Sequence, residues 1–153
     1  GEALHAVVFG DGPVQLFPAG AYFEVRVERV CAGHGDGLTL GVASALPRPP
    51  GQTLFADIGD VPGTWSLGFD GRAFLAGQAD MVPIGWNPKD LQPGDTVGLL
   101  VTGHGALHLF VNGQLRVHGL GGVPAPAQAP LYAVLDLLGN TTAVSLLPGA
   151  APP

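Results

Sequence analysis

The clearest pattern in the chain is an alternation of apolar and polar residues between positions 22 and 30. Phe23, Val25 and Val27 fall on one face of an extended segment, and charged residues occupy the positions between them. Alternation with a period of two is typical of a β-strand with one buried face, because successive side chains point to opposite sides. Residues 22–30 are therefore predicted to form a strand.

Short apolar segments bounded by turn residues recur along the chain and predict more strands. These segments are residues 6–9, 14–17, 38–43, 64–69, 72–75, 96–102, 106–112, 114–118, 131–138 and 143–147. Asp70-Gly71 and Asn112-Gly113 are favoured in two-residue hairpin turns, because both central positions of the type I′ turn need a positive φ. Residues 10–13 also have the composition of a turn. The pattern therefore predicts several hairpins.

Glycine and proline leave little room for helices. The chain has 25 Gly and 15 Pro residues, and only residues 21–32 form a stretch longer than eight residues with neither. A proline inside a helix costs about 3 kcal/mol and a glycine about 1 kcal/mol. Strands joined by turns tolerate this spacing, and the sequence has no internal repeat of propeller or solenoid length. We therefore expect an all-β fold, an antiparallel two-sheet β-sandwich.

Three connections rich in Gly and Pro are expected to lie on the surface, at residues 44–63, 77–94 and 119–130. Loops on a rigid sandwich are common places for binding residues. The length of 153 residues suits a single domain. We expect this domain to span residues 1–148 and residues 149–153 to form a disordered tail.

Composition and charge exclude several classes of protein. Hydrophobic residues make up 46% of the chain and charged residues 12%, which favours a folded domain over a disordered one. The formal net charge of −6 argues against binding to nucleic acid or to an anionic membrane surface. No apolar run approaches the roughly 20 residues that span a bilayer. The single cysteine, Cys31, forms no internal disulfide, which fits the reducing cytoplasm.

No residue pattern in the sequence indicates catalysis or a bound metal. His104 and His108 are four residues apart, but on a strand this spacing separates them by about 13 Å. The sequence lacks the common metal-binding motifs, a nucleophile elbow and a phosphate-binding loop. Cys31 is expected to be a lone buried thiol, and Asp136 either points outward or fixes a neighbouring loop. We therefore expect no enzyme activity, no cofactor and no metal site.

Several segments in a fixed order resemble the Neuralized homology repeat. The strongest is Leu-Gln-Pro-Gly-Asp-Thr-Val-Gly-Leu-Leu at residues 91–100, which runs into Leu-His-Leu-Phe-Val-Asn-Gly at residues 107–113. The other matching segments are residues 7–10, 13–14, 20–28, 37–42, 63–65, 131–139 and 144–146. Three features depart from the family pattern, and one of them is an unusually Pro-rich loop at residues 44–63. His34-Gly35-Asp36-Gly37 stands where the family has Trp-x-Gly, and the usual N-terminal hairpin before Val7 is missing or cut off.

This resemblance implies a SPRY-like sandwich of the concanavalin-like jelly-roll type that acts as a protein-interaction module. Such repeats occur in Neuralized-type ubiquitin ligases, where they bind substrates such as the intracellular tails of Notch ligands. They also occur in tandem in a scaffold associated with centrosomes. The chain has no RING cysteines, so we expect it to recognise a partner for a ubiquitin ligase or a ligase-associated scaffold. The expected location is the cytoplasm, including the centrosome.

The hypothesis from the sequence is that a protein or peptide ligand binds loops at one end of the sandwich. The candidate contact residues are His34, Asp36, Trp86, Asn87 and Asn140. Trp86 is expected to be exposed and to supply buried area on binding, whereas Trp65 is expected in the core. The alternatives are a glycan-binding lectin of similar shape, a hydrolase with two convergent carboxylates, and a structural spacer that binds only neighbouring repeats of a tandem array.

Overall fold

The described part of the chain consists almost entirely of β-strands. The computed structural model describes residues 7–33, 35–45, 63–137 and 139–153. The strands are β1 (Val7–Pro13), β2 (Leu16–Phe17), β3 (Gly20–Val30), β4 (Thr39–Ala43), β5 (Thr64–Gly68), β6 (Arg72–Leu75), β7 (Val82–Pro83), β8 (Thr96–Thr102), β9 (Leu107–Val111), β10 (Gln114–Leu120), β11 (Tyr132–Asp136) and β12 (Thr141–Leu146). One short 3-10 helix, η2 (Pro88–Asp90), lies between β7 and β8.

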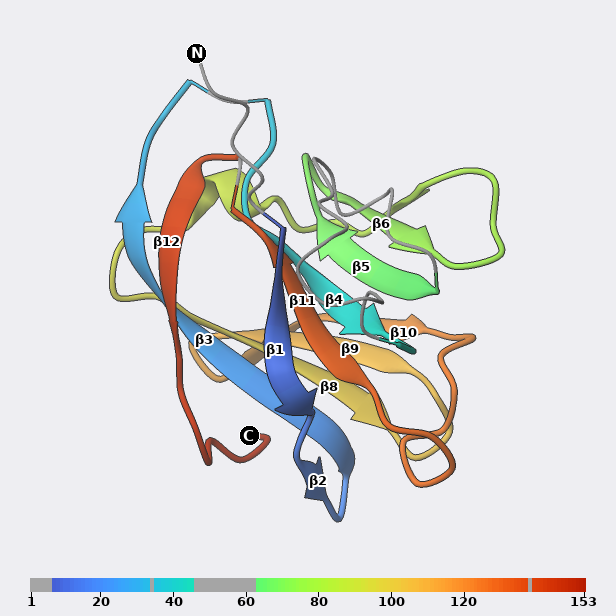
Figure 1. Cartoon of the computed structure of the whole chain (residues 1–153). Helices are drawn as coiled ribbons and strands as arrows, with labels where there is room; N and C mark the ends of the chain where they lie inside the picture. The colour runs from blue at the N-terminus through green and yellow to red at the C-terminus, as the bar shows by residue number, and fades with distance from the viewer. Residues whose placement is uncertain (1–6, 34, 46–62, 138) are drawn as a thin grey trace.

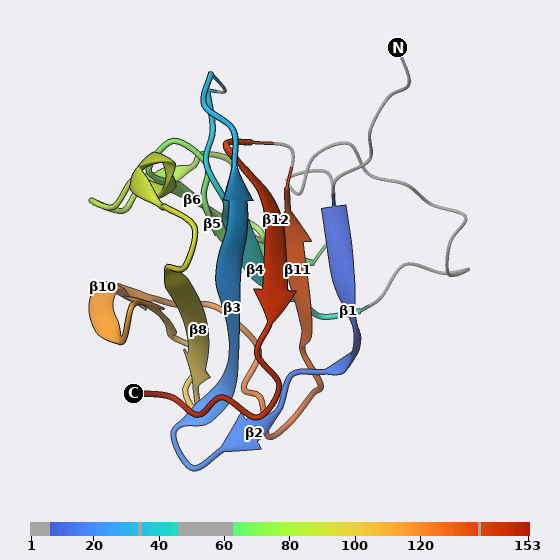
Figure 2. The same cartoon turned by 90° about the vertical axis from the view of Figure 1, so that its left-hand side faces the viewer.

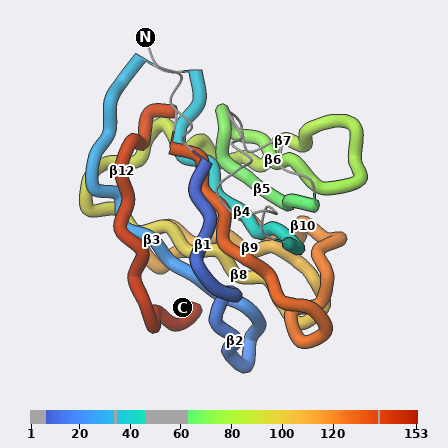
Figure 3. Tube along the Cα trace, in the orientation of Figure 1, coloured from blue at the N-terminus to red at the C-terminus, as the bar shows by residue number. Residues whose placement is uncertain are grey.

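These strands form two stacked sheets (Figures 1 and 2). Sheet A has the strand order β1-β11-β4-β5-β6-β7, and the two-residue β7 is labelled in Figure 3. Sheet B has the order β10-β9-β8-β3-β12, with β2 paired to β3. All the strand pairs are antiparallel. The predicted all-β, two-sheet sandwich is confirmed.

The main hydrophobic core lies between the two sheets. Phe23, Val25 and Val27 of β3 are all buried in it, as their alternation predicted. Trp65 of β5 belongs to the same cluster, which confirms its expected place in the core. Because each strand gives one face to this core, the connections between strands are left at the two ends of the sandwich.

One of the two predicted two-residue turns is confirmed and the other is wrong. Asn112 and Gly113 have φ values of 51° and 78° and link β9 to β10, whose residues Val111 and Gln114 pair directly. Between β5 and β6 the paired residues are Gly68 and Arg72, so the loop has three residues and begins at Phe69. The buried Phe69 side chain and the bond from its N–H to Thr39 Oγ1 at 2.9 Å set this turn.

Two local predictions near the strand ends are also wrong. Residues 10–13 belong to β1 and do not form a turn, because β1 continues to Pro13, which pairs with Tyr132 of β11. The register shifts between Phe9 and Pro13, so these residues are irregular within the strand. Cys31 is exposed and not buried, because it lies beyond the last residue of β3.

Tyr22 is buried on the outer face of sheet B, on the side opposite Phe23. Its ring makes edge-on contacts with Phe17 and Phe110, each with ring centroids 6.4 Å apart. Gly98 on the neighbouring β8 leaves space for the phenol, because a Cβ at Gly98 would overlap the Tyr22 hydroxyl. Burial raises the pKa of Tyr22, and the hydrogen bond from its hydroxyl to Glu24 Oε1 at 2.6 Å adds to this rise.

Gly98→Ala is expected to lower the free energy of unfolding by about 1–3 kcal/mol, because the new methyl group must displace the Tyr22 ring. The cost should be smaller in a Tyr22→Phe background, which removes the nearest overlapping atom, the hydroxyl oxygen, and leaves the ring. Chemical denaturation of the two single variants and the double variant measures this coupling. Gly103→Ala is the control, because a Cβ at Gly103 meets no atom within 4 Å. Equal costs in both backgrounds would contradict the proposed contact.

Candidate functional site

Four connections from different parts of the chain meet at one end of the sandwich, at the top of Figure 1. The segment after β3 is joined to the β11–β12 connection by a backbone hydrogen bond, in which the N–H of Asn140 donates to the oxygen of Asp36 at 2.8 Å. The N–H of Cys31 donates to the oxygen of Asn140 at 2.6 Å. The N–H of Gly37 donates to the oxygen of Phe69 at 2.8 Å, which adds the β5–β6 loop.

Two glycines allow these connections to approach closely. A Cβ at Gly37 would lie 2.7 Å from the backbone nitrogen of Lys89, at η2. A Cβ at Gly139 would lie 2.5 Å from the backbone oxygen of Asp36. Real Cβ atoms do not come this near to backbone atoms, so either position needs glycine unless the loops move apart. The close packing joins all four connections into one surface.

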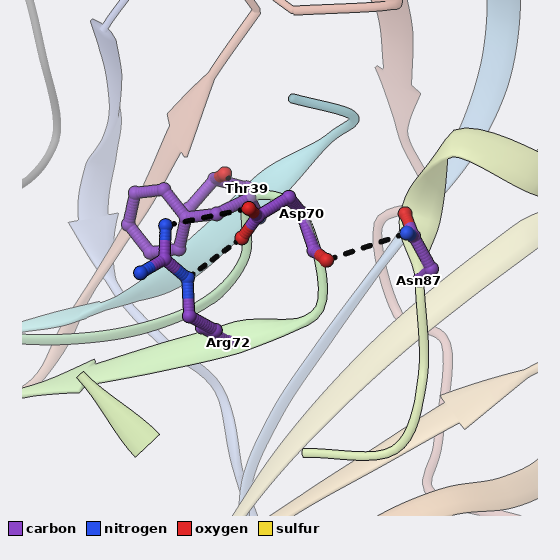
Figure 4. A network of polar contacts seen from close by, with 5 residues as sticks. Thr39, Asp70, Arg72 and Asn87 are labelled. Atoms are coloured by element: carbon purple, nitrogen blue, oxygen red, sulfur yellow. Dashed lines mark hydrogen bonds and ion pairs between the residues drawn. The ribbon is translucent and has the colours of Figure 1, made fainter. Parts of the chain in front are cut away.

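Asn87 fixes the fourth connection, which carries η2 (Figure 4). Its side-chain oxygen accepts from the N–H of Lys89 at 3.0 Å, which caps η2, and Pro88 occupies the first turn. Its side-chain nitrogen donates to the backbone oxygen of Asp70 at 3.3 Å. Asn87 therefore links η2 to the β5–β6 loop.

An exposed ion pair lies beside this link. Arg72 Nε donates to Asp70 Oδ1 at 2.7 Å, and Arg72 Nη2 donates to Asp70 Oδ2 at 3.3 Å (Figure 4). The hydrogen bond from Arg72 lowers the pKa of the Asp70 carboxyl, and the positive charge of the guanidinium adds to this. Water screens such a pair, so it orients the two side chains more than it stabilises the fold.

The structure brings three of the five predicted contact residues to this end. Asp36 is exposed, and Asn87 and Asn140 are half-buried. His34 lies outside the described residues. Trp86 is not exposed as expected: only 6% of its surface is accessible, and it lies in the main core together with Leu91. The two apolar residues flank η2 and hold it against the core, which explains the burial. That any of the five contacts a partner stays a prediction.

Sequence reasoning missed the exposed charges at this end. These are Asp70 in the β5–β6 loop, Arg72 at the start of β6, and Lys89 and Asp90 on η2. The order Asn-Pro is a signal for the start of a helical turn, with Asn as cap and Pro in the first turn, and it could have indicated that the next residues form a short helix. We call the exposed or half-buried polar residues Asp36, Asp70, Arg72, Asn87, Lys89, Asp90 and Asn140 the loop end.

Metal-ligating clusters and membrane-spanning helices are both absent from the part of the chain that the structure describes. Within the ranges that the structure covers, no three His, Cys, Asp or Glu side chains gather where they could hold a metal ion. No helix among the described residues has the length and apolar character needed to cross a bilayer. Asp136, which the sequence singled out, is buried at the end of β11.

A pair of histidines lies away from the loop end, on neighbouring strands of sheet B. His108 of β9 and His118 of β10 stack with ring centroids 6.4 Å apart and an angle of 20° between the rings. Burial lowers the pKa of His108, and the nearby positive charge of a protonated His118 lowers it further. Protonation of His108 is therefore less favourable in the folded chain than in the unfolded one.

The chain matches one protein family and is similar in fold to several solved structures. The family model described as Neuralized matches residues 2–148. The crystal structure of the NHR1 domain of Drosophila melanogaster Neuralized is similar at 19% identity and a TM-score of 0.66, covering 93% of this chain and 79% of that one. The solution structure of the NHR domain of the same Drosophila protein gives 19% identity, a TM-score of 0.67, and coverage of 92% and 73%. A human SPRY domain gives 18% identity, a TM-score of 0.61, and coverage of 95% and 85%.

Gly139→Ala is expected to separate the β11–β12 connection from the segment after β3, because the new methyl group would strike the backbone oxygen of Asp36. The free energy of unfolding should fall by about 1–3 kcal/mol, and the amide hydrogen of Asn140 should exchange faster with solvent. Hydrogen exchange and chemical denaturation measure the two effects. Gly103→Ala serves again as the control. Unchanged exchange at Asn140 would show that the connections are not packed as described.

Acidification from pH 7.5 to 5.5 is expected to destabilise the fold through His108. Because its pKa is lower in the folded chain, the unfolded chain binds more protons in this range, and the free energy of unfolding falls as the pH falls. His108→Gln should make the thermal midpoint less dependent on pH. His104→Gln, in the exposed turn between β8 and β9, is the control. An unaltered pH dependence in His108→Gln would contradict this assignment.

Proposed function

This chain belongs to the Neuralized family, and on that premise we propose that it is a non-catalytic protein-recognition domain whose ligand binds the loop end. The observation that carries the proposal is the set of hydrogen bonds that ties the four connections together. A binding surface that is already ordered loses less conformational entropy when a ligand docks. The order of the loop end therefore supports the proposal that a ligand binds there.

The chemistry of the loop end suits a polar peptide or protein surface. Asp36, Asp70 and Asp90 present carboxylates, and Arg72 and Lys89 present donors. Interfaces of this kind gain specificity from charge complementarity and from hydrogen bonds at a polar rim. None of the seven residues of the loop end is Trp, Tyr or Phe, so this surface lacks the aromatic side chains that the lectin alternative would use.

The finer proposal is that the ligand is a substrate or partner of a ubiquitin ligase, or of a scaffold associated with one. It rests on the family to which the chain belongs, in which such domains recognise proteins such as the intracellular tails of Notch ligands. The domain would select the target, and another part of the ligase would transfer ubiquitin. On this proposal the domain would act in the cytoplasm, including the centrosome.

The test is the affinity of the domain for a labelled peptide from the intracellular tail of a Notch ligand. Asp36→Arg combined with Lys89→Glu should weaken binding at least about tenfold, because two charges at the loop end are reversed. Arg116→Glu, on the exposed edge strand β10, is the matched control and should bind normally. Circular dichroism checks that all three proteins fold.

Other outcomes would separate the alternatives. Equal binding by the loop-end variant and the wild-type domain would show that the loop end is not the site. Binding to a glycan array, with no binding to the tail peptide, would favour the lectin. Association only with neighbouring repeats would favour the spacer. Trp86→Ala is unsuited to this purpose, because it removes a core side chain.

A further inference from the structure

Two apolar depressions lie side by side at the end of the sandwich opposite the loop end. One has a volume of about 240 Å³ and lies between the β1–β2 segment and residues 126–131. The other has a volume of about 200 Å³ and lies between residues 10–15 and residues 146–150. Pro13 and Val14 line both of them; Val14 is buried, and the exposed Pro13 forms the ridge between the two.

β3 sets the distance between this surface and the loop end. The strand begins at Gly20, beside the two depressions, and ends at Val30, where the segment that leads to Asp36 starts. Ten residue steps of about 3.3 Å separate its ends by roughly 33 Å. In Figure 3, β2, the connection before β11 and the C-terminus lie at the bottom of the view, at the end of the sandwich opposite the loop end. We call the surface formed by the two depressions and their ridge the far-end surface.

The far-end surface carries the two most exposed large hydrophobic side chains among the described residues. Leu16 and Leu146 are 58% and 53% exposed, and each lines one of the depressions. The described chain has only two other large hydrophobic side chains with such exposure, Val8 and Leu115. Pro126, Ala127, Ala129 and Pro130 extend the apolar wall. Contiguous exposed apolar surface of this kind is typical of interaction sites.

The size of the depressions favours side chains of a peptide over a small molecule. Pockets for drug-sized ligands have volumes of about 300–1,000 Å³, and each depression here is smaller than that range. Two neighbouring depressions with a ridge between them suit two apolar side chains of one extended segment. The segment would cross the ridge at Pro13.

The negative charge beside the depressions indicates which kind of partner would bind there. Asp11 is the only charged residue among those that line the two depressions, and it is exposed. The whole chain has a formal net charge of −6. A second copy docked on the same surface would bring Asp11 towards Asp11, which is unfavourable in a symmetric interface. A segment with a Lys or Arg near its apolar residues would complement this carboxylate.

We propose that the far-end surface is a second binding site, which takes an extended segment of another protein with two apolar anchors and an adjacent Lys or Arg. The anchors occupy the depressions beside Leu16 and Leu146, and the cation pairs with Asp11. The site is separate from the loop end and does not depend on the function proposed for it. The domain would thus bind two different segments at its two ends.

Fluorescein-labelled ten-residue peptides are the probe. Each is built from Gly and Ser with one Lys and two Leu residues, and the spacing between the leucines varies from two to five residues across the set. A matched set carries Glu in place of Lys. At least one Lys peptide should bind at least about tenfold more tightly than its Glu counterpart. Failure of every Lys peptide to bind, or equal binding of the two sets, would overturn the proposal.

Substitutions at the far-end surface test whether the Lys peptide binds there. Leu16→Ser and Leu146→Ser should each weaken the best Lys peptide at least about fivefold, because each removes an apolar contact. Leu115→Ser is the matched control, since Leu115 is 48% exposed but lies on β10 and lines neither depression. Asp11→Asn should reduce the preference for Lys over Glu. Equal losses in Leu115→Ser and Leu16→Ser would mean non-specific apolar binding and would refute the site.

Two further measurements distinguish binding at the far-end surface from binding at the loop end and from self-association. Chemical shifts in the nuclear magnetic resonance spectrum should change at Gln15 and Gln128 when the peptide is added, and should not change at Asn140. The variant that combines Asp36→Arg with Lys89→Glu should bind the Lys peptide normally. The proposal for the far-end surface can therefore be tested even if the proposal for the loop end fails. Sedimentation that shows a dimer abolished by Leu16→Ser, with no peptide binding, would assign the surface to self-association and overturn the proposal.

Discussion

The burial of one face of each sheet against the other is the constraint on which the rest of the structure depends. The side chains of Phe23, Val25 and Val27 can leave water only if a second sheet covers them. Antiparallel strands that satisfy this requirement must turn at the two ends of the sandwich. The positions of both proposed binding surfaces therefore follow from the packing of the core.

The loop end shows how a core can order a surface. Trp86 and Leu91 belong to the core, and the short helix between them is held in place by their burial. Asn87 then connects this helix to the β5–β6 loop, and Gly37 and Gly139 let the remaining connections pack closely. Hydrophobic packing, capping and close backbone approach thus act together to place exposed charges beside one another.

The sequence predicted the features that depend on local pattern and missed those that depend on distant contacts. The alternation on β3 and the Asn112-Gly113 turn were predicted because neighbouring residues determine them. The prediction of a two-residue turn at Asp70-Gly71 was wrong. The shape of this loop depends on the burial of Phe69 and on the hydrogen bond from Phe69 to Thr39, thirty residues away. The prediction that Trp86 is exposed was also wrong, because its burial depends on packing against core residues that are distant in the sequence. The far-end surface joins residues near 13, 128 and 147, so no single stretch of sequence indicated it.

The burial of Trp65 and Trp86 has an optical consequence. Both indoles of the chain are at most 8% accessible, so in the native protein they emit from an apolar environment and are shielded from dissolved quenchers. A shift of their emission towards longer wavelength therefore reports loss of the core.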